Sequence, residues 1–525
     1  MPTSSSTALQ WLSLVAIIWL QAINGTNTNF PAYSSELKQF LSISQVQLNN
    51  LAFASDAGKL FGWFSGMASL YLPLWLVLLI GSILGLIGYG VQYLFITDKI
   101  SSLSYCHVFL LTVVAGNGIC WFNTVCYVVA IRNFPCNRQV AVGITNSYQG
   151  LSAKIYTNIV EAVSPQHKAR TFLLLNAVLP AIVTIITAPF AREIENTGSK
   201  QMGIGFIVMF VVTIGTGIYA VATSLQSVSR KMSALGILIG ILVSLLLPLI
   251  IPVSMKIKEL ADAWKMKRER LRVHHSTVEQ NSVAAEERIE NDEEKEGEEE
   301  EESREVQESD VSREEIGWNL MLRRIDFWLY YFVYLFGATI GMVFLNNLGQ
   351  IAESRGFSST NSLVSLSSSF GFFGRLMPSL VDYFYRGKHT ISRPASIMVL
   401  MAPTPAAFFL LLHKSNLALY ASTAIIGVCS GAITSIAVST TTELFGAKGF
   451  SVNHNLVVSN ISLGSFLFGY FAGVLYRKEG HVADGKCMGM ECYRHTFIIW
   501  GSLCFFGTFL AFILHMRTRK FYSHR

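Results

Sequence analysis

The chain is poor in charged residues. Only 14% of its 525 residues are Asp, Glu, Lys or Arg, and 51% are hydrophobic, whereas soluble proteins usually carry about 25% charged residues. This composition excludes an ordinary soluble protein. The formal net charge is only +6, and no basic patch interleaved with aromatic residues indicates a nucleic-acid partner.

Signatures of catalysis are also missing. The sequence contains no GxSxG elbow, no GxxxxGK[ST] phosphate loop, no HExxH and no paired CxxC. The missing phosphate loop argues against a pump driven directly by ATP. We therefore expect a protein that is not an enzyme, with no cofactor and no resident metal ion.

Cysteine is sparse and scattered. Of eight cysteines, only Cys487 and Cys492 lie together in a polar loop. We expect this loop on the non-cytoplasmic side, where a disulfide can persist. Free thiols are the alternative interpretation.

Long apolar runs dominate the sequence. Each run reaches the roughly 20 residues that a helix needs to cross a bilayer. The runs predict fourteen helices, at 8–31, 48–70, 72–96, 104–131, 139–163, 170–191, 203–226, 232–256, 327–348, 361–382, 393–413, 417–440, 452–476 and 496–516. The first run has no basic lead and no small-residue cleavage site after it, so we interpret it as a retained helix.

The order of the helices predicts four regions. We expect an N-terminal six-helix bundle over 8–191, an extra helix pair over 203–256, a charged linker over 257–325 and a C-terminal six-helix bundle over 327–516. Lys and Arg concentrate in alternate loops, which predicts that both termini are cytoplasmic. The sequence favours neither the plasma membrane nor the vacuolar membrane.

The linker has two parts of opposite charge. Lys256–Arg272 is basic and is typical of a helix that lies against anionic lipid. Glu286–Asp310 is mostly Glu, which repels itself and predicts disorder. A solvated linker is the simpler interpretation, and a regulatory or docking segment is the alternative.

The stretch Ser55–Gly66 carries two charges inside an apolar run. Each intramembrane charge costs about 2.5–3.5 kcal/mol and needs a partner or a wet cavity. A shift of 316 residues places Gly58-Lys59-Leu60 on Gly374-Arg375-Leu376. Such a repeat is typical of transporters built from two related bundles.

The candidate charged residues follow from this stretch and from the fifth helix. Asp56 and Lys59 are three residues apart and can neutralise each other on one helix face. They predict either a structural pair, or a gating or proton-coupling group with Asp56 titrating, or a direct substrate contact. Lys154 has no acid three or four residues away, so it is a candidate for binding an anion. The alternative is a pair with a carboxylate on another helix, such as Asp56. Arg375 mirrors Lys59 and is the other candidate cation.

Neutral polar residues in the predicted helices are candidates for hydrogen bonds to a substrate. They are Asn24, Asn27, Asn123, Asn346 and Asn347. For the first helix, a locally unwound helix end is the alternative. His454 can titrate near neutral pH, although a hydrogen-bonded structural histidine is the simpler interpretation.

Several longer motifs resemble one family, the plant nodulin-like proteins of the major facilitator superfamily, which include nuclear-fusion-defective-like transporters. The motifs are Trp19–Asn27, Tyr33–Lys38, Ser55–Gly66, Ile119–Thr124, Ile131–Pro135 and the Cys487–Cys492 loop. The nodulin-like resemblance covers about 8–256, and a facilitator-type second half covers about 320–516. It implies two six-helix bundles around a central cavity that work by alternating access. One departure is that the usual acidic and basic residues after the second helix are missing, since Gly66 leads into an apolar loop.

The sequence thus predicts an all-α integral membrane protein with the major facilitator fold. We expect a secondary transporter of a small polar solute, with an organic anion and proton coupling as narrower hypotheses. Its expected partners are the lipid bilayer, the solute and protons, and no protein partner is indicated. The alternative is a non-transporting membrane sensor or scaffold that signals through the acidic linker.

Overall fold

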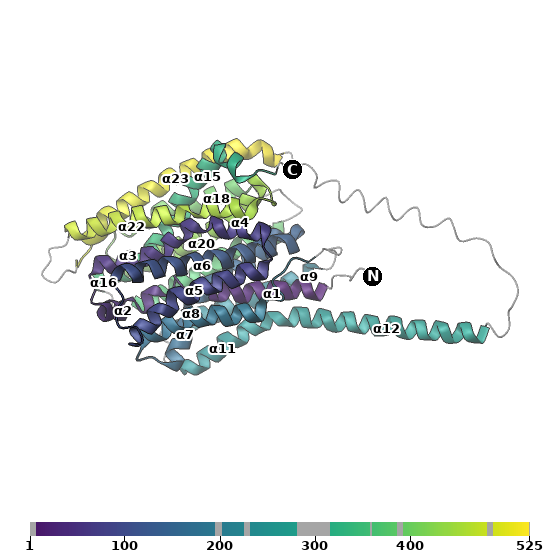
Figure 1. Ribbon diagram of the computed structural model, residues 1–525. Coiled ribbons are helices and arrows are strands. Elements are labelled where there is room, and N and C mark those ends of the chain that lie inside the picture. Colours follow the sequence, from purple (N-terminus) through teal and green to yellow (C-terminus); the bar gives the residue numbers. More distant parts are fainter. Residues whose placement is uncertain are drawn as a thin grey trace.

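The computed structural model describes residues 7–194, 202–224, 231–280, 315–356, 360–385, 392–479 and 487–523. The described ranges form helices and no strand, and the long helices run side by side through one body (Figure 1). A helix satisfies its backbone polar groups within one segment, as a membrane requires. The predicted all-α membrane fold is confirmed.

The first half comprises six membrane-length segments. Its elements are α1 Thr7–Ile23, η1 Phe30–Ala32, α2 Ser34–Leu41, α3 Gln45–Ala57, η2 Gly58–Phe61, α4 Trp63–Tyr71, α5 Leu74–Ile96, α6 Tyr105–Asn133, η3 Pro135–Asn137, α7 Arg138–Val163 and α8 Lys168–Thr187. The second segment is broken, because the 3₁₀ turn η2 separates α3 from α4. A 3₁₀ stretch inside a helix often marks a hinge.

An extra helix pair follows. It comprises α9 Met202–Ser224, α11 Ala234–Leu246, the turn η4 Leu247–Leu249 and α12 Ile250–Gln280. The expectation that the pair ends at residue 256 is wrong, because α12 continues well past it as one unbroken helix. The acidic stretch 286–310 lies outside the described residues.

The second half repeats the six-segment pattern. Its elements are α14 Trp318–Arg323, α15 Ile325–Tyr334, η5 Leu335–Thr339, α16 Ile340–Ser354, α17 Thr360–Tyr385, α18 Arg393–Met401, α19 Pro403–Leu410, α20 Asn416–Phe445, α21 Phe450–Val458, α22 Asn460–Glu479 and α23 Glu491–Ser523. The turn η5 is a π-helical turn between α15 and α16. Such turns frequently occur at functional sites.

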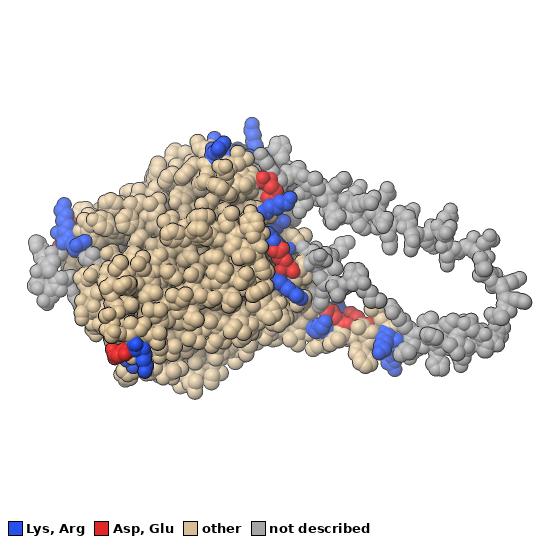
Figure 2. Space-filling model, viewed as in Figure 1, with Lys and Arg blue, Asp and Glu red and all other residues tan. Residues whose placement is uncertain are grey.

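Ten described helices are long and apolar enough to span a membrane. Four further predicted spans correspond to α1, which has 17 residues, to the broken second segment, and to α7 and α17, which carry many polar side chains. On the face shown in Figure 2, charged side chains gather at the two ends of the body and leave its middle free of charge. The start of α1 and the end of α23 lie at the same end (Figure 1), which we call the termini side.

The two halves meet along two pairs of helices. The α3–α4 segment packs against α22 and α21, and α7 packs against α17. The extra pair lies beside the second contact, where α9 touches both α7 and α17 and α11 touches α7. Each half therefore contributes its second and fifth segments to the interface.

Close helix packing explains why the internal repeat has a glycine in each half. A Cβ added at Gly58 would lie 2.2 Å from the carbonyl oxygen of Val113 on α6, and one added at Gly374 would lie 2.3 Å from that of Val428 on α20. Both partners lie in the fourth segment of their own half. A glycine therefore allows the second and fourth segments to touch, and the cation that follows it takes an equivalent place.

Substituting valine for either glycine tests this packing. Forcing the two helices apart should cost at least about 1–3 kcal/mol, so Gly58→Val and Gly374→Val should both lower the folded yield and the melting temperature. Gly85→Val on α5 is the matched control, because an added Cβ there meets no atom within 4 Å. Melting temperatures equal to that of the control would contradict the packing argument.

Candidate functional site

A central cavity of about 90 Å³ lies between the two halves. The first half contributes side chains from the turn after α1, from η2, α6 and α7, and the second half contributes them from α15, α16, α17, α20, α21 and α22. Its polar lining consists of Asn27, Thr28, Lys59, Asn123, Thr124, Tyr127, Asn146, Gln149, Tyr334, Arg375, Thr434, Ser451, His454 and Asn455. The cavity is thus a polar chamber inside an apolar body.

Both repeat cations line this cavity, but their partners differ. Lys59 Nζ lies 2.6 Å from Asp56 Oδ1, and both side chains are buried. Arg375 makes no ion pair with any residue that the structure describes, and its buried Nε has no hydrogen-bond partner there. The cavity therefore holds one neutralised cation and one cation that has no counter-charge within the described parts of the chain.

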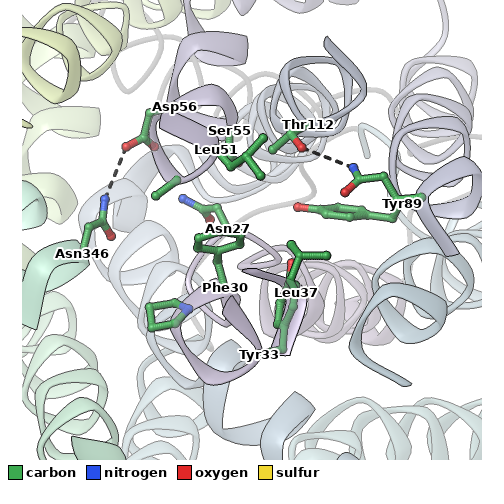
Figure 3. A pocket seen from close by; sticks show the side chains of 13 residues that line it. Asn27, Phe30, Tyr33, Leu37, Leu51, Ser55, Asp56, Tyr89, Thr112 and Asn346 are labelled. Carbon is green, nitrogen blue, oxygen red and sulfur yellow. Dashed lines mark hydrogen bonds between the residues drawn. The ribbon is translucent and has the colours of Figure 1, made fainter. Parts of the chain in front are cut away.

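Asp56 lines a second, smaller pocket, where its carboxylate points toward Asn346 (Figure 3). Besides Lys59, its carboxylate accepts hydrogen bonds from Ser465 Oγ at 2.6 Å and from Asn346 Nδ2 at 3.4 Å. Its carbonyl oxygen accepts one from Ser462 Oγ at 2.6 Å. Ser462, Ser465 and Asn346 all belong to the second half. Asp56 therefore joins the two halves between the small pocket and the central cavity.

The asparagines of the first half lie at the end of α1. Because α1 ends at Ile23, Asn24 and Asn27 occupy the turn that follows. Asn24 Nδ2 donates to Asn123 Oδ1 at 2.9 Å, which also accepts from Gln149 Nε2 at 3.4 Å. Asn27 lines both the small pocket and the central cavity. The structure thus has the locally unwound helix end that was one of the two sequence interpretations, and this end places Asn27 at the cavity.

His454 lines the cavity and is held from three sides. Its Nδ1 lies 3.2 Å from Thr441 Oγ1, its ring stacks on Phe450 at 5.1 Å, and the ring of Tyr127 meets it edge-on at 5.5 Å. This arrangement matches the hydrogen-bonded structural histidine.

Two further predicted site residues, Lys154 and Asn347, line neither the central cavity nor the small pocket. Lys154 Nζ donates to the carbonyl oxygen of Thr223 at 3.3 Å, in the last turn of α9. A cation at a helix C-terminus interacts favourably with the helix dipole, so Lys154 holds the extra pair. Asn347 donates to the carbonyl oxygen of Val343 in its own helix at 2.8 Å.

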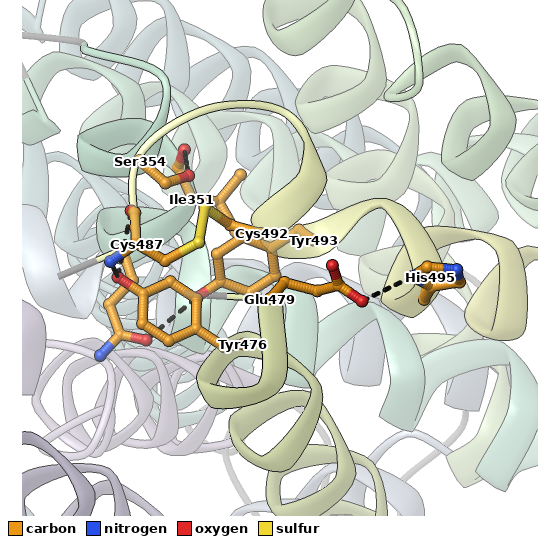
Figure 4. The surroundings of a disulfide bond; sticks show 9 residues. Ile351, Ser354, Tyr476, Glu479, Cys487, Cys492, Tyr493 and His495 are labelled. Carbon is orange, nitrogen blue, oxygen red and sulfur yellow. Dashed lines mark hydrogen bonds and ion pairs between the residues drawn. A yellow bond between two sulfur atoms is a disulfide. The ribbon is translucent and has the colours of Figure 1, made fainter. Parts of the chain in front are cut away.

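The predicted cysteine pair is a disulfide in the structure. Cys487 and Cys492 are bonded at the start of α23 (Figure 4), which lies at the end of the body opposite the termini (Figure 1). The backbone amide of Cys487 donates to Tyr476 Oη at 2.9 Å, and that of Gly489 donates to the carbonyl oxygen of Ser354 at 2.7 Å. The bridged loop is thereby fastened to the ends of α22 and α16.

Hydrogen bonds join the halves on the termini side of the cavity as well. Ser451 Oγ donates to the carbonyl oxygen of Gly66 at 3.1 Å, and Ser379 Oγ donates to that of Gln139 at 2.9 Å. With the contacts of Asp56 on the other side, the chamber lies between two sets of cross-half bonds.

Sequence reasoning missed several lining residues. Tyr334 immediately precedes the π-helical turn, and Gln149 and Asn146 lie on the cavity face of α7. Polar residues occur at many positions of α7, so the sequence alone did not indicate which face of this helix lines the cavity. The serines that hold Asp56 gave none, because their role depends on how the two halves pack.

The arrangement of the helices defines the class of protein. Two bundles of six segments around a shared chamber form the fold of the major facilitator superfamily. The chain is similar in structure to a proton-dependent oligopeptide transporter, with a TM-score of 0.52 at 13% sequence identity. The match covers 98% of this chain and 99% of the transporter chain. That match shows the fold of a multi-pass membrane protein.

The sequence identifies the particular family. Residues 10–253 match the nodulin-like family, and residues 311–524 match the NFD4 C-terminal domain. Protein NUCLEAR FUSION DEFECTIVE 4 of Arabidopsis thaliana is 38% identical over 536 residues, which cover 98% of this chain and 90% of that protein. The chain belongs to the nodulin-like family, as the sequence motifs predicted.

Removing one partner of the buried ion pair tests its energetic role. Lys59→Met leaves the Asp56 carboxylate buried among neutral donors, which should cost about 3–5 kcal/mol, and adding Asp56→Asn should recover most of the loss. The control is Arg494→Met, which breaks an exposed pair with Glu491 (3.3 Å) and should cost no more than about 1 kcal/mol. Thermal unfolding of the purified variants measures the difference. A Lys59→Met variant as stable as the control would contradict this role.

Proposed function

We propose that the protein is a secondary transporter that carries a small organic anion through the membrane by alternating access, with both termini in the cytoplasm. The observation that supports this most is Arg375, a cation in the central cavity without a counter-charge among the described residues. A charge inside the membrane is costly unless it is paired. An anionic solute would supply the missing partner.

The geometry also supports a defined size and mode of binding. A carboxylate can accept two parallel hydrogen bonds from a guanidinium, and Arg375 has donors free to give them. Tyr127, Tyr334 and Gln149 line the same chamber and would bond the remaining polar groups of the solute. The cavity volume of about 90 Å³ suits a small solute.

Alternating access requires that the two sets of cross-half bonds open in turn. On the termini side these are hydrogen bonds from Ser451 to the carbonyl oxygen of Gly66 and from Ser379 and Ser439 to Gln139. On the opposite side, three donors of the second half meet Asp56. We infer that Asp56 is the gating group of that side.

Proton coupling follows as part of the same proposal. Asp56 lines the small pocket and Lys59 lines the central cavity, so the pair lies between a route from the opposite side and the solute. Protonation of Asp56 would weaken the hold of its carboxylate on Lys59, Ser465 and Asn346. A proton would thereby favour opening of this gate.

The charge of Arg375 is tested by uptake into liposomes that contain purified protein. Arg375→Gln should reduce uptake of organic anions by roughly 10- to 100-fold, the value of a hydrogen bond to a charged group. Lys154→Gln is the matched control, because it removes a buried cation that does not line the cavity, and it should retain uptake. Saturable uptake that survives Arg375→Gln would refute the anion site. A lack of flux by folded wild-type protein would favour the sensor alternative.

The role of Asp56 is tested in the same liposomes with a proton gradient. The gradient should accelerate uptake by wild-type protein, and Asp56→Asn should lose that acceleration while it still exchanges solute across the membrane at equal pH. Ser465→Ala, which removes a hydrogen bond but keeps the carboxylate, should retain the acceleration. An accelerated Asp56→Asn variant would place the coupling group elsewhere.

A further inference from the structure

The helix α12 leaves the body on the termini side. It follows α11 after the short 3₁₀ turn η4, is itself unbroken, and extends beyond the start of α1 along the direction of the spans (Figure 1). Glu259 Oε1 accepts a hydrogen bond from the backbone amide of Ala8 at 3.0 Å. This contact marks where α12 passes the first residues of α1. At 1.5 Å per residue, Trp264 lies about 7 Å and Arg268 about 13 Å further out.

One face of this projecting helix is an exposed apolar stripe. With 3.6 residues per turn, Val253, Ile257, Leu260 and Trp264 lie on one side. Trp264 is 73% exposed, Ile257 62% and Leu260 51%. No residue that the structure describes covers them. A contiguous apolar surface of this kind usually marks an interaction site.

The charges of α12 are arranged around this stripe. By the same helical spacing, Lys256 and Lys267 border it on one side and Arg268 borders it on the other, whereas Lys258 and Lys265 lie further round the helix. The acids Glu259 and Asp262 lie on the far face, where Glu259 meets α1. The described charges of α12 lie outside the band of charges that ends the body (Figure 2). The apolar stripe is therefore bordered by cations and points away from the rest of the protein.

The direction of the helix argues against lipid as the cover. A helix that binds a bilayer surface lies in the plane of the interface, whereas α12 continues along the direction of the spans (Figure 1). The prediction of a helix lying against anionic lipid therefore does not match the direction of α12. The acidic stretch Glu286–Asp310 has charges that complement the lysines, but it contains no aromatic residue and only two large aliphatic ones, Ile289 and Val306. Its composition therefore offers few side chains to pack on an apolar stripe.

We propose that residues 253–268 of α12 form a docking helix for an acidic protein whose apolar groove encloses a single amphipathic helix. This is the chemistry of a Ca²⁺-loaded EF-hand sensor, which takes an apolar face into a Met-rich groove. Trp264 is the anchor, Leu260 and Ile257 extend the contact, and the flanking lysines meet the acidic rim. Docking would link the transporter to cytosolic Ca²⁺ through the helix pair that touches both halves.

The test is binding of Ca²⁺-loaded calmodulin to the full-length protein in nanodiscs. Wild-type protein should bind the probe, and a Ca²⁺ chelator should abolish binding. Trp264→Glu and Leu260→Glu should each weaken binding by at least about tenfold, as expected for anchor residues. Met266→Glu is the matched control, because Met266 is 58% exposed on the opposite face of the same helix, and its affinity should stay within about twofold of wild type.

Three results would overturn the proposal. The first is no binding of calmodulin by the wild-type protein. The second is equal loss of affinity in the Met266→Glu and Trp264→Glu variants. The third is quenching by brominated lipid of a fluorophore attached at Trp264→Cys in the absence of calmodulin, which would show that the bilayer covers the stripe.

Discussion

The cost of an unpaired charge inside a membrane is the constraint on which the site depends. Each half of the protein carries a cation directly after a glycine that allows its second segment to touch its fourth. The glycine fixes the backbone, and the cation is thereby placed at the central chamber. Lys59, in the turn η2, is neutralised by Asp56 at the end of α3. Arg375 has no such partner among the described residues. The internal repeat therefore places one paired and one unpaired cation at the chamber.

This asymmetry connects binding to conformational change. The neutralised pair lies at the contact between the halves on one side of the chamber, where Asp56 also holds three donors of the second half. The unpaired cation lies in the chamber itself, where a solute would meet it. A solute that neutralises Arg375 and a proton that releases Asp56 would act on two ends of one polar network. The extra helix pair touches both halves beside α7 and α17, so a partner bound to α12 would act on the same interface.

The sequence predicted the class of fold, the two halves and both repeat cations, because apolar length and charge in a membrane leave few alternatives. It could not predict which candidates share a chamber. Lys154 has no acid within a helical turn, yet the structure places it at the C-terminus of α9, a partner that depends on where the extra pair packs. Asn346 is brought to Asp56 across the two halves, which no spacing along one helix reveals. The sequence predicted a basic helix over Lys256–Arg272 but not that it is one helix with the end of the extra pair, because its lysines lower the hydropathy that marks a span.

The central claim is that the chamber selects a negative charge, and ligand-induced stabilisation of the wild-type protein tests it most directly. A ligand that binds only the folded state raises the melting temperature in proportion to its concentration relative to its dissociation constant. We would compare small carboxylic acids with their uncharged amides at equal concentrations. The account predicts that at least one acid stabilises the protein while its amide does not. Stabilisation by the amide as strong as by the acid, or by neutral and cationic solutes alone, would contradict it.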